Sequence, residues 1–186
     1  MEEQAPVEAL LQGVRKRHLH HIQKERGTAR VGKHYWLMKS EPKVFSISDL
    51  KIRPRSTDHW DGVRNYLARN YMRKMTKGDL VLFYHSNCEI PGVVGIAEIV
   101  HEAYPDHTAF EPLSPYYDTK STPQNPRWFM VDVRWKKDFR RTISLHEMRN
   151  TPALKGMKVL EKGQRLSVMP VTREEFEKVC ALGRAP

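Results

Sequence analysis

The chain has 186 residues, 39% of them hydrophobic and 29% charged, which suits one folded domain with an appendage, or two small domains, and excludes a largely disordered chain. No apolar run approaches the roughly 20 residues of a membrane helix, and the N-terminus lacks the apolar core of a signal peptide, so a soluble intracellular protein is expected. The formal net charge of +10 favours a phosphate polyanion such as nucleic acid as partner, although many intracellular proteins are modestly basic without one.

Residues 1–33 differ in character from the rest of the chain. Pro6 and the near-helical spacing of the apolar residues after it predict a basic helix, and "GTARVGK" is typical of a linker. We therefore expect an N-terminal extension over residues 1–33 and one folded domain over residues 34–184. Three histidines of the extension have a spacing that fits no established metal-ligand pattern, so we expect them to be solvated: His18, His20 and His21.

A short strand and a helical turn open the domain. "YWLMKS" predicts a strand over residues 35–40, whose alternation puts Trp36 and Met38 on one face and the intervening residues on the other. In "FSISDLK", Ser46 or Ser48 is the expected helix N-cap.

The stretch "HWDGVRNYLARNYM" (59–72) indicates the start of a helix. Asp61 is the expected N-cap, and the i, i+4 spacing of four apolar residues predicts a row that faces the core. That row consists of Val63, Leu67, Tyr71 and Met75.

The middle of the chain predicts three strands. "GDLVLFYHS" (78–86) and "GVVGIAEIV" (92–100) are joined by a short loop and form a hairpin candidate, and "RWFMVDVRW" (127–135) alternates in the same way. Between the last two lies a loop with five prolines, which we expect to be an ordered surface loop held by its aromatic residues.

The last third predicts a capped helix, a strand and a closing helix. Ser144 and Glu147 make one capping box, and Thr172 and Glu175 make a second one after a strand at 164–171. Cys180 falls at an apolar position of the closing helix, while Cys88 lies in a loop, and no disulfide is expected. The sum is an α+β domain with a small, strongly curved or barrel-like sheet flanked by short helices.

Standard catalytic and metal-binding signatures are absent from the sequence, which contains no G-x-S-x-G elbow, P-loop, Rossmann glycine triplet or H-E-x-x-H motif. His85 and Ser86 adjoin, but neighbours on a strand point to opposite faces, so they cannot act as a base and nucleophile pair. We expect no enzymatic activity, no cofactor and no metal.

Polar and aromatic residues do gather where predicted strands end and helices begin. Trp60 or Tyr84 can stack on a flat heterocycle, although Trp60 can equally fasten the helix start to the core. The edge of such a ring can be read by polar side chains, namely Lys39, Ser40, Asp61, Asn65 and His85. Phosphate can be held by three arginines, namely Arg64, Arg69 and Arg165.

These motifs together resemble the EVE domain family. The resemblance rests on "YWLMKSEP", "WDGVRNYLARN", "GDLVLFYHSN", "GVVGIAEIVHEAYPD", "NPRWFMVDV" and "QRLSVMPVT", which run in order from Tyr35 to Leu182. It implies a PUA-like fold, related to the YTH readers of methylated adenine, and a pocket for a flipped, modified base, with modified cytosine in DNA favoured and RNA also considered. Carried over residue by residue, the pocket involves Lys39, Ser40, Trp60, Asp61, Arg64, Asn65, Tyr84, His85 and Ser86.

One position departs from the family pattern. Leu67 stands where glutamine is common, and because the periodicity puts it on the buried row, we interpret it as a packing change. The expectation is a non-enzymatic nucleic-acid reader. A bacterial member with a cytoplasmic location is favoured, and a nuclear location is expected if the protein is eukaryotic. The alternatives are a module that binds RNA or accompanies RNA modification, and a protein that binds a nucleoside or small metabolite. The sequence does not give the oligomeric state.

Overall fold

A six-stranded mixed sheet forms the centre of residues 32–184, the part of the chain that the computed structural model describes. The strand order is β2-β5-β4-β3-β1-β6, and all neighbours are antiparallel except the parallel pair β1 and β3. The strands are β1 (Tyr35–Ser40), β2 (Thr57–Trp60), β3 (Leu80–His85), β4 (Gly92–Pro105), β5 (Phe129–Ser144) and β6 (Val168–Val171). The predicted N-terminal helix and its three histidines lie outside the described residues.

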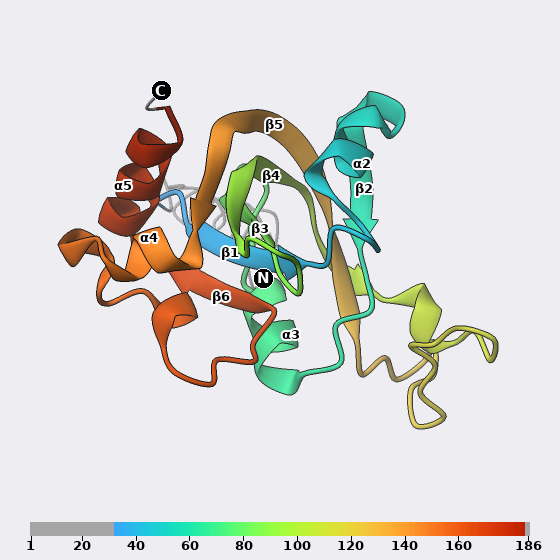
Figure 1. Cartoon of the computed structure of the whole chain (residues 1–186). Helices are drawn as coiled ribbons and strands as arrows, with labels where there is room; N and C mark the ends of the chain where they lie inside the picture. Colours follow the sequence, from blue (N-terminus) through green and yellow to red (C-terminus); the bar gives the residue numbers. More distant parts are fainter. Residues whose placement is uncertain (1–31, 185–186) are drawn as a thin grey trace, which may run out of the picture. The chain divides into compact units, whose positions relative to one another are not determined.

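Curvature comes from the two long strands. β4 and β5 pair along most of their length, but their register shifts at four places, and a further shift separates Phe83 from Tyr84 in the pairing of β3 with β4. Each such irregularity bends and twists the strand that carries it. As a result β5 is strongly bent along its length (Figure 1). The expected strongly curved sheet is confirmed.

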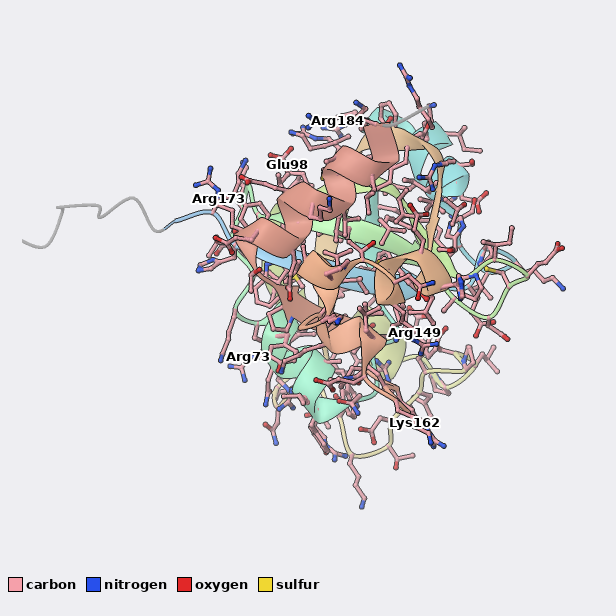
Figure 2. The ribbon with its side chains drawn as sticks, turned by 60° about the vertical axis from the view of Figure 1, so that its left-hand side comes forward. Arg73, Glu98, Arg149, Lys162, Arg173 and Arg184 are labelled. Carbon is pink, nitrogen blue, oxygen red and sulfur yellow. The ribbon has the colours of Figure 1, made fainter. Side chains whose placement is uncertain are left out.

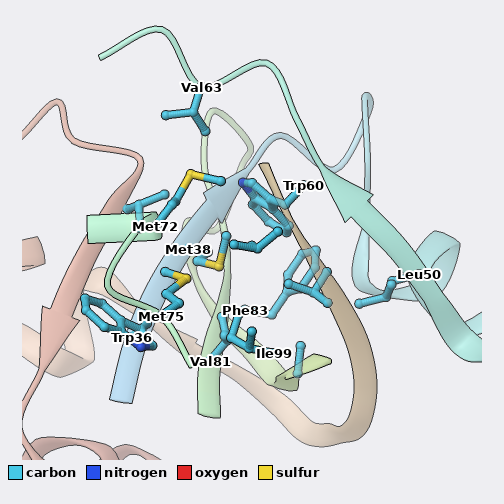
Figure 3. Close-up of a cluster of buried hydrophobic side chains, with 14 of the residues drawn as sticks. Trp36, Met38, Leu50, Trp60, Val63, Met72, Met75, Val81, Phe83 and Ile99 are labelled. Carbon is cyan, nitrogen blue, oxygen red and sulfur yellow. The ribbon is translucent and has the colours of Figure 1, made fainter. Parts of the chain in front are cut away.

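Both faces of the sheet are buried. Trp36 and Met38 of β1 belong to one apolar cluster, and Leu37 between them belongs to a second, so the predicted alternation of this strand is confirmed. Helices α2 (Ile47–Ile52) and α3 (Tyr66–Met72) pack on the first cluster (Figure 3), and α4 (Leu145–Arg149) and α5 (Arg173–Arg184) on the second. Four short 3-10 helices complete residues 32–184: Pro54–Ser56, His107–Ala109, Pro152–Leu154 and Lys158–Leu160.

Helix α3 begins later than the sequence predicts. Its N-cap is Asn65, whose Oδ1 accepts from the N–H groups of Leu67 and Ala68 at 2.9 and 3.1 Å, and not Asp61. The predicted core row is therefore wrong at Leu67, which is 47% exposed, and Ala68 is buried beside it. Since Leu67 faces outward, its interpretation as a packing change in the core is wrong as well.

The other helix ends agree with their sequence signals. Ser46 caps α2, and Thr172 and Glu175 make reciprocal hydrogen bonds at the start of α5. Ser144 caps α4, but the Glu147 carboxylate pairs with Arg141 instead of closing the expected box. Cys180 is buried, as its position in the helix predicts.

The surface carries the excess positive charge. Arg73, Arg149 and Lys162 are exposed and project outward from the ribbon (Figure 2). None of the helices in residues 32–184 is long and apolar enough to cross a bilayer.

Candidate functional site

A cavity of about 820 Å³ is lined by the C-terminal end of β1, the turn after it, the edge strand β2 and the segment that leads from β2 to α3. This volume lies in the range of ordinary small-ligand pockets. One wall is apolar and contains Val44 and Phe45 from the turn after β1. Another wall contains residues 61–64 together with Tyr116 of the proline-rich loop.

Trp60 lines the cavity but belongs mainly to the core. Its side chain is 7% exposed, and its ring meets Phe83 edge to face at a centroid distance of 5.3 Å and Phe45 at 6.1 Å. Figure 3 shows it among the buried side chains of the first cluster. The indole is thus fixed by its neighbours, and only a small part of it is available to a ligand.

Tyr116 offers a more accessible aromatic ring. It is 37% exposed and lies against Gly62, where an added Cβ would stand 2.6 Å from the ring. Gly62 also has a φ of +70°, a conformation that residues with a Cβ rarely adopt. Glycine at position 62 therefore lets the chain turn and lets Tyr116 close the wall.

An ion pair between the partly buried Arg64 and the buried Asp106 holds this wall together. Arg64 donates to the Asp106 carboxylate at 2.7 Å, to the Thr108 hydroxyl at 3.1 Å and to the Tyr116 carbonyl at 2.8 Å. Asp106 is fully buried and also accepts from the N–H groups of Gly62 and Thr108. Burial alone would raise the pKa of Asp106, but the hydrogen bonds from Arg64 and Thr108 and the charge of Arg64 bring that pKa below its usual value.

Acidic side chains and a histidine lie along β2 and just after it. His59 stands 3.1 Å from the Asp58 carboxylate and 3.7 Å from that of Asp61, and all three line the cavity. Burial raises the pKa of Asp61, and the nearby Asp106 charge adds to this, while His59 opposes it. Asp61 is thus a partly desolvated carboxylate that can accept hydrogen bonds from a ligand.

Lys39 and Ser40 line the cavity from the end of β1. The Lys39 ammonium donates to the Gln164 carbonyl at 3.3 Å, and burial lowers its pKa. The Ser40 hydroxyl donates to the Phe45 carbonyl at 2.7 Å, which ties the turn after β1.

Four further residues predicted for the pocket are absent from its lining. Asn65 caps α3, and His85 accepts from the N–H group of Ile47 at 3.2 Å. The Ser86 hydroxyl is 3.4 Å from the Ser40 carbonyl. Tyr84 is buried in the second apolar cluster, and burial raises its pKa to about 12.

The structure also separates the three predicted phosphate ligands. Arg64 lines the cavity, but its guanidinium is engaged by Asp106, Thr108 and the Tyr116 carbonyl. Arg69 lies over the ring of Tyr66 at 4.8 Å and donates to the Arg127 carbonyl at 2.7 Å. Arg165 is exposed, two residues before the cavity-lining Ser167.

Tyr116 and Asp106 are site residues that the sequence did not reveal. Both come from the proline-rich loop, which was expected to be ordered by its aromatic residues, but the sequence contained no signal that this loop folds back on the segment after β2. Gly62 was the available hint, because an Asp-Gly step before a helix often needs a positive φ.

Within residues 32–184 no group of three or more histidine, cysteine or acidic side chains could hold a metal ion. The same residues contain no serine or threonine hydroxyl that is hydrogen-bonded to a histidine. What the cavity does offer is an aromatic ring, an apolar wall and hydrogen-bonding groups. These features suit the binding of a flat polar ring.

Fold and cavity define an α+β domain of the PUA-like type, with a cavity at the C-terminal end of β1 and beside the edge strand β2. The EVE domain model matches residues 34–182, and the chain belongs to the EVE domain family.

Relatives of known name or known structure are consistent with this family membership. Human thymocyte nuclear protein 1 is 48% identical over 165 residues, which cover 80% of this chain and 73% of that protein. The crystal structure of human THYN1 in complex with 5-methylcytosine-containing DNA is similar with a TM-score of 0.77 and 47% identity, over 83% of this chain and 99% of that one. A Pseudomonas syringae protein of known structure is similar with a TM-score of 0.77 and 46% identity, over 80% and 99%.

Proposed function

We propose that this domain is a reader of DNA that carries a modified cytosine, and that the modified base enters the cavity after leaving the duplex. The observation that carries this proposal is a cavity of about 820 Å³ whose walls supply an aromatic ring, an apolar surface and the partly buried carboxylate of Asp61. The similarity to human THYN1, solved with 5-methylcytosine-containing DNA, supports the choice of base and polymer. The net charge of +10 supports a polyanionic partner.

Each wall has a proposed role. Tyr116 stacks on the base, Asp61 accepts from the exocyclic amine of cytosine, and Val44 and Phe45 contact the 5-methyl group. Arg64 acts on the base through Tyr116, because its guanidinium holds the loop that carries this ring. We infer binding without turnover, since the cavity pairs no hydroxyl with a base.

Fluorescence anisotropy with matched oligonucleotides tests the proposal. The set carries cytosine, 5-methylcytosine, 5-hydroxymethylcytosine or N6-methyladenine at one position, in DNA and in RNA, at fixed salt. We expect 5-methylcytosine DNA to bind at least about tenfold more tightly than unmodified DNA, which corresponds to about 1.4 kcal/mol. Equal affinities throughout would show that the domain binds only the nucleic-acid backbone. A preference confined to RNA would show that RNA, and not DNA, is the partner.

A pair of tyrosine variants locates the stacking role. Tyr116→Ala should lose the preference for the modified base, since stacking contributes about 1–3 kcal/mol per base. Tyr117→Ala is the matched control, because Tyr117 is 43% exposed and absent from the cavity lining. Equal behaviour of the two variants would refute the role of Tyr116.

A variant of Asp61 tests the reading of the base edge. An asparagine amide can donate to the O4 atom of thymine as well as accept from cytosine. Asp61→Asn should therefore narrow the difference in affinity between 5-methylcytosine and thymine by about tenfold. An unchanged difference would show that another group reads the amine.

The name of the vertebrate relatives supports a nuclear location for this chain, in place of the cytoplasmic one expected for a bacterial member. Fractionation of cells that express the full chain would test this.

A further inference from the structure

The turn between α2 and β2 holds two consecutive residues in the left-handed region. Arg55 has φ 56° and ψ 23°, and Ser56 has φ 50°. This conformation is sterically unfavourable for residues with a Cβ, and it is commonly found where a function requires it. Glycine would satisfy the same backbone without strain.

Hydrogen bonds fix this turn on both sides. The Ser56 N–H donates to the Arg53 carbonyl at 2.7 Å, and its hydroxyl donates to the Lys51 carbonyl at 2.9 Å. The Thr57 hydroxyl donates to the Arg55 carbonyl at 3.0 Å. Only the backbone of Arg55 takes part in these contacts, so the fold requires its conformation but not its guanidinium.

The turn borders the cavity. Arg53, Pro54 and Thr57 line it on either side of Arg55, which is itself exposed. Neighbouring cations are neutralised, since Arg53 pairs with Asp58 at 2.7 Å and Lys51 with Asp138 at 2.6 Å. Within residues 32–184 Arg55 makes no ion pair, so an exposed and unneutralised guanidinium is carried by a hydrogen-bonded turn whose neighbouring residues line the cavity.

We propose that Arg55 binds a backbone phosphate of the DNA strand next to the nucleotide in the cavity. This inference rests on the proposed function, because a base inside the cavity brings its flanking phosphates to the residues that border it. A guanidinium matches the geometry of a phosphate with two parallel hydrogen bonds. A rigid turn reduces the conformational freedom that binding would otherwise remove.

Substitution by glycine separates binding from folding. Arg55→Gly removes the guanidinium and also relieves the strained conformation, so the Tm should stay or rise while the affinity for DNA falls. We expect about a tenfold loss of affinity. The slope of log K against log salt should become shallower by about 0.9, the value for one phosphate contact on B-DNA. Arg55→Lys keeps the charge and should keep the slope.

Arg140→Ala is the control for general surface charge, because Arg140 is exposed on β5 and absent from the cavity lining. Anisotropy titrations of the full chain at several salt concentrations, on modified and unmodified duplexes, give the slopes. An unchanged slope in Arg55→Gly, an equal change in Arg140→Ala, or a fall in the Tm of Arg55→Gly would overturn the proposal. The two proposals fail separately: a wild-type protein without preference for modified cytosine refutes base reading, whereas a changed slope on unmodified DNA still supports the phosphate contact of Arg55.

Discussion

Replacement of Arg64 by methionine should destabilise the domain more than the loss of any exposed ion pair. Arg64 is the cation that faces the fully buried carboxylate of Asp106, at 2.7 Å. Methionine preserves most of the side-chain volume but leaves the carboxylate without a compensating charge.

The structure sets the size of this effect. Removal of one partner of a buried pair costs about 3–5 kcal/mol. We expect the lower end, about 3 kcal/mol, because Asp106 keeps three hydrogen bonds from Gly62 and Thr108, and the Arg64 side chain is 21% exposed, so water can reach the gap.

Urea unfolding at neutral pH measures the difference. Arg141→Met is the matched control, since Arg141 pairs with Glu147 at 2.6 Å while the two side chains are 42% and 29% exposed. Such an exposed pair contributes at most about 1 kcal/mol. The double variant Arg64→Met with Asp106→Asn should recover part of the loss, because it no longer buries an unpaired charge.

The pH dependence gives a second check. The pKa of Asp106 is lowered from 3.8 in the folded protein, so its contribution to stability is present above that value and is lost as the pH falls through the folded-state pKa. The difference in the free energy of unfolding between wild type and Arg64→Met should therefore become smaller in acid. Equal losses in Arg64→Met and Arg141→Met, or a gap that widens in acid, would refute the reasoning.

Single contacts elsewhere in the domain lead to four more predictions. Leu67→Gln should change the free energy of unfolding by less than about 0.5 kcal/mol, since Leu67 is exposed, and urea unfolding would reveal a larger packing role. Gly62→Ala should cost about 1–2 kcal/mol for the left-handed backbone alone and weaken binding of modified DNA through Tyr116, as denaturation and anisotropy would report. A thiol reagent should label Cys88 in the folded protein and Cys180 only after unfolding, because burial raises the pKa of Cys180 to about 11, and mass spectrometry of the labelled peptides would show otherwise. On acidification the preference for cytosine should weaken before the fold does, because the pKa of Asp61 is raised and that of Asp106 lowered; anisotropy and circular dichroism over the same pH range would detect the reverse order.

The sequence determined the elements whose signals are local. The alternation of β1, the Ser46 cap of α2 and the reciprocal cap of α5 each depend on residues within a few positions of one another. Side-chain direction in a strand and hydrogen bonding at a helix start need no distant partner, so these predictions were confirmed.

Only the tertiary structure decided how the site is built. α3 starts at Tyr66 with Asn65 as its N-cap, and the segment before it is held by Asp106 through contacts across more than forty residues, which no local pattern encodes. Arg64, which pairs with Asp106, also binds the Tyr116 carbonyl, and the Tyr116 ring lies against Gly62. Leu67, one residue into α3, faces outward. The sequence left open whether Trp60 stacks on a ligand or fastens the helix start to the core, and the structure places Phe83 and Phe45 around its ring. Periodicity and motifs indicate which polar and aromatic residues each element carries. The pairing of Arg64 with Asp106 of the proline-rich loop decides which of these residues line one cavity.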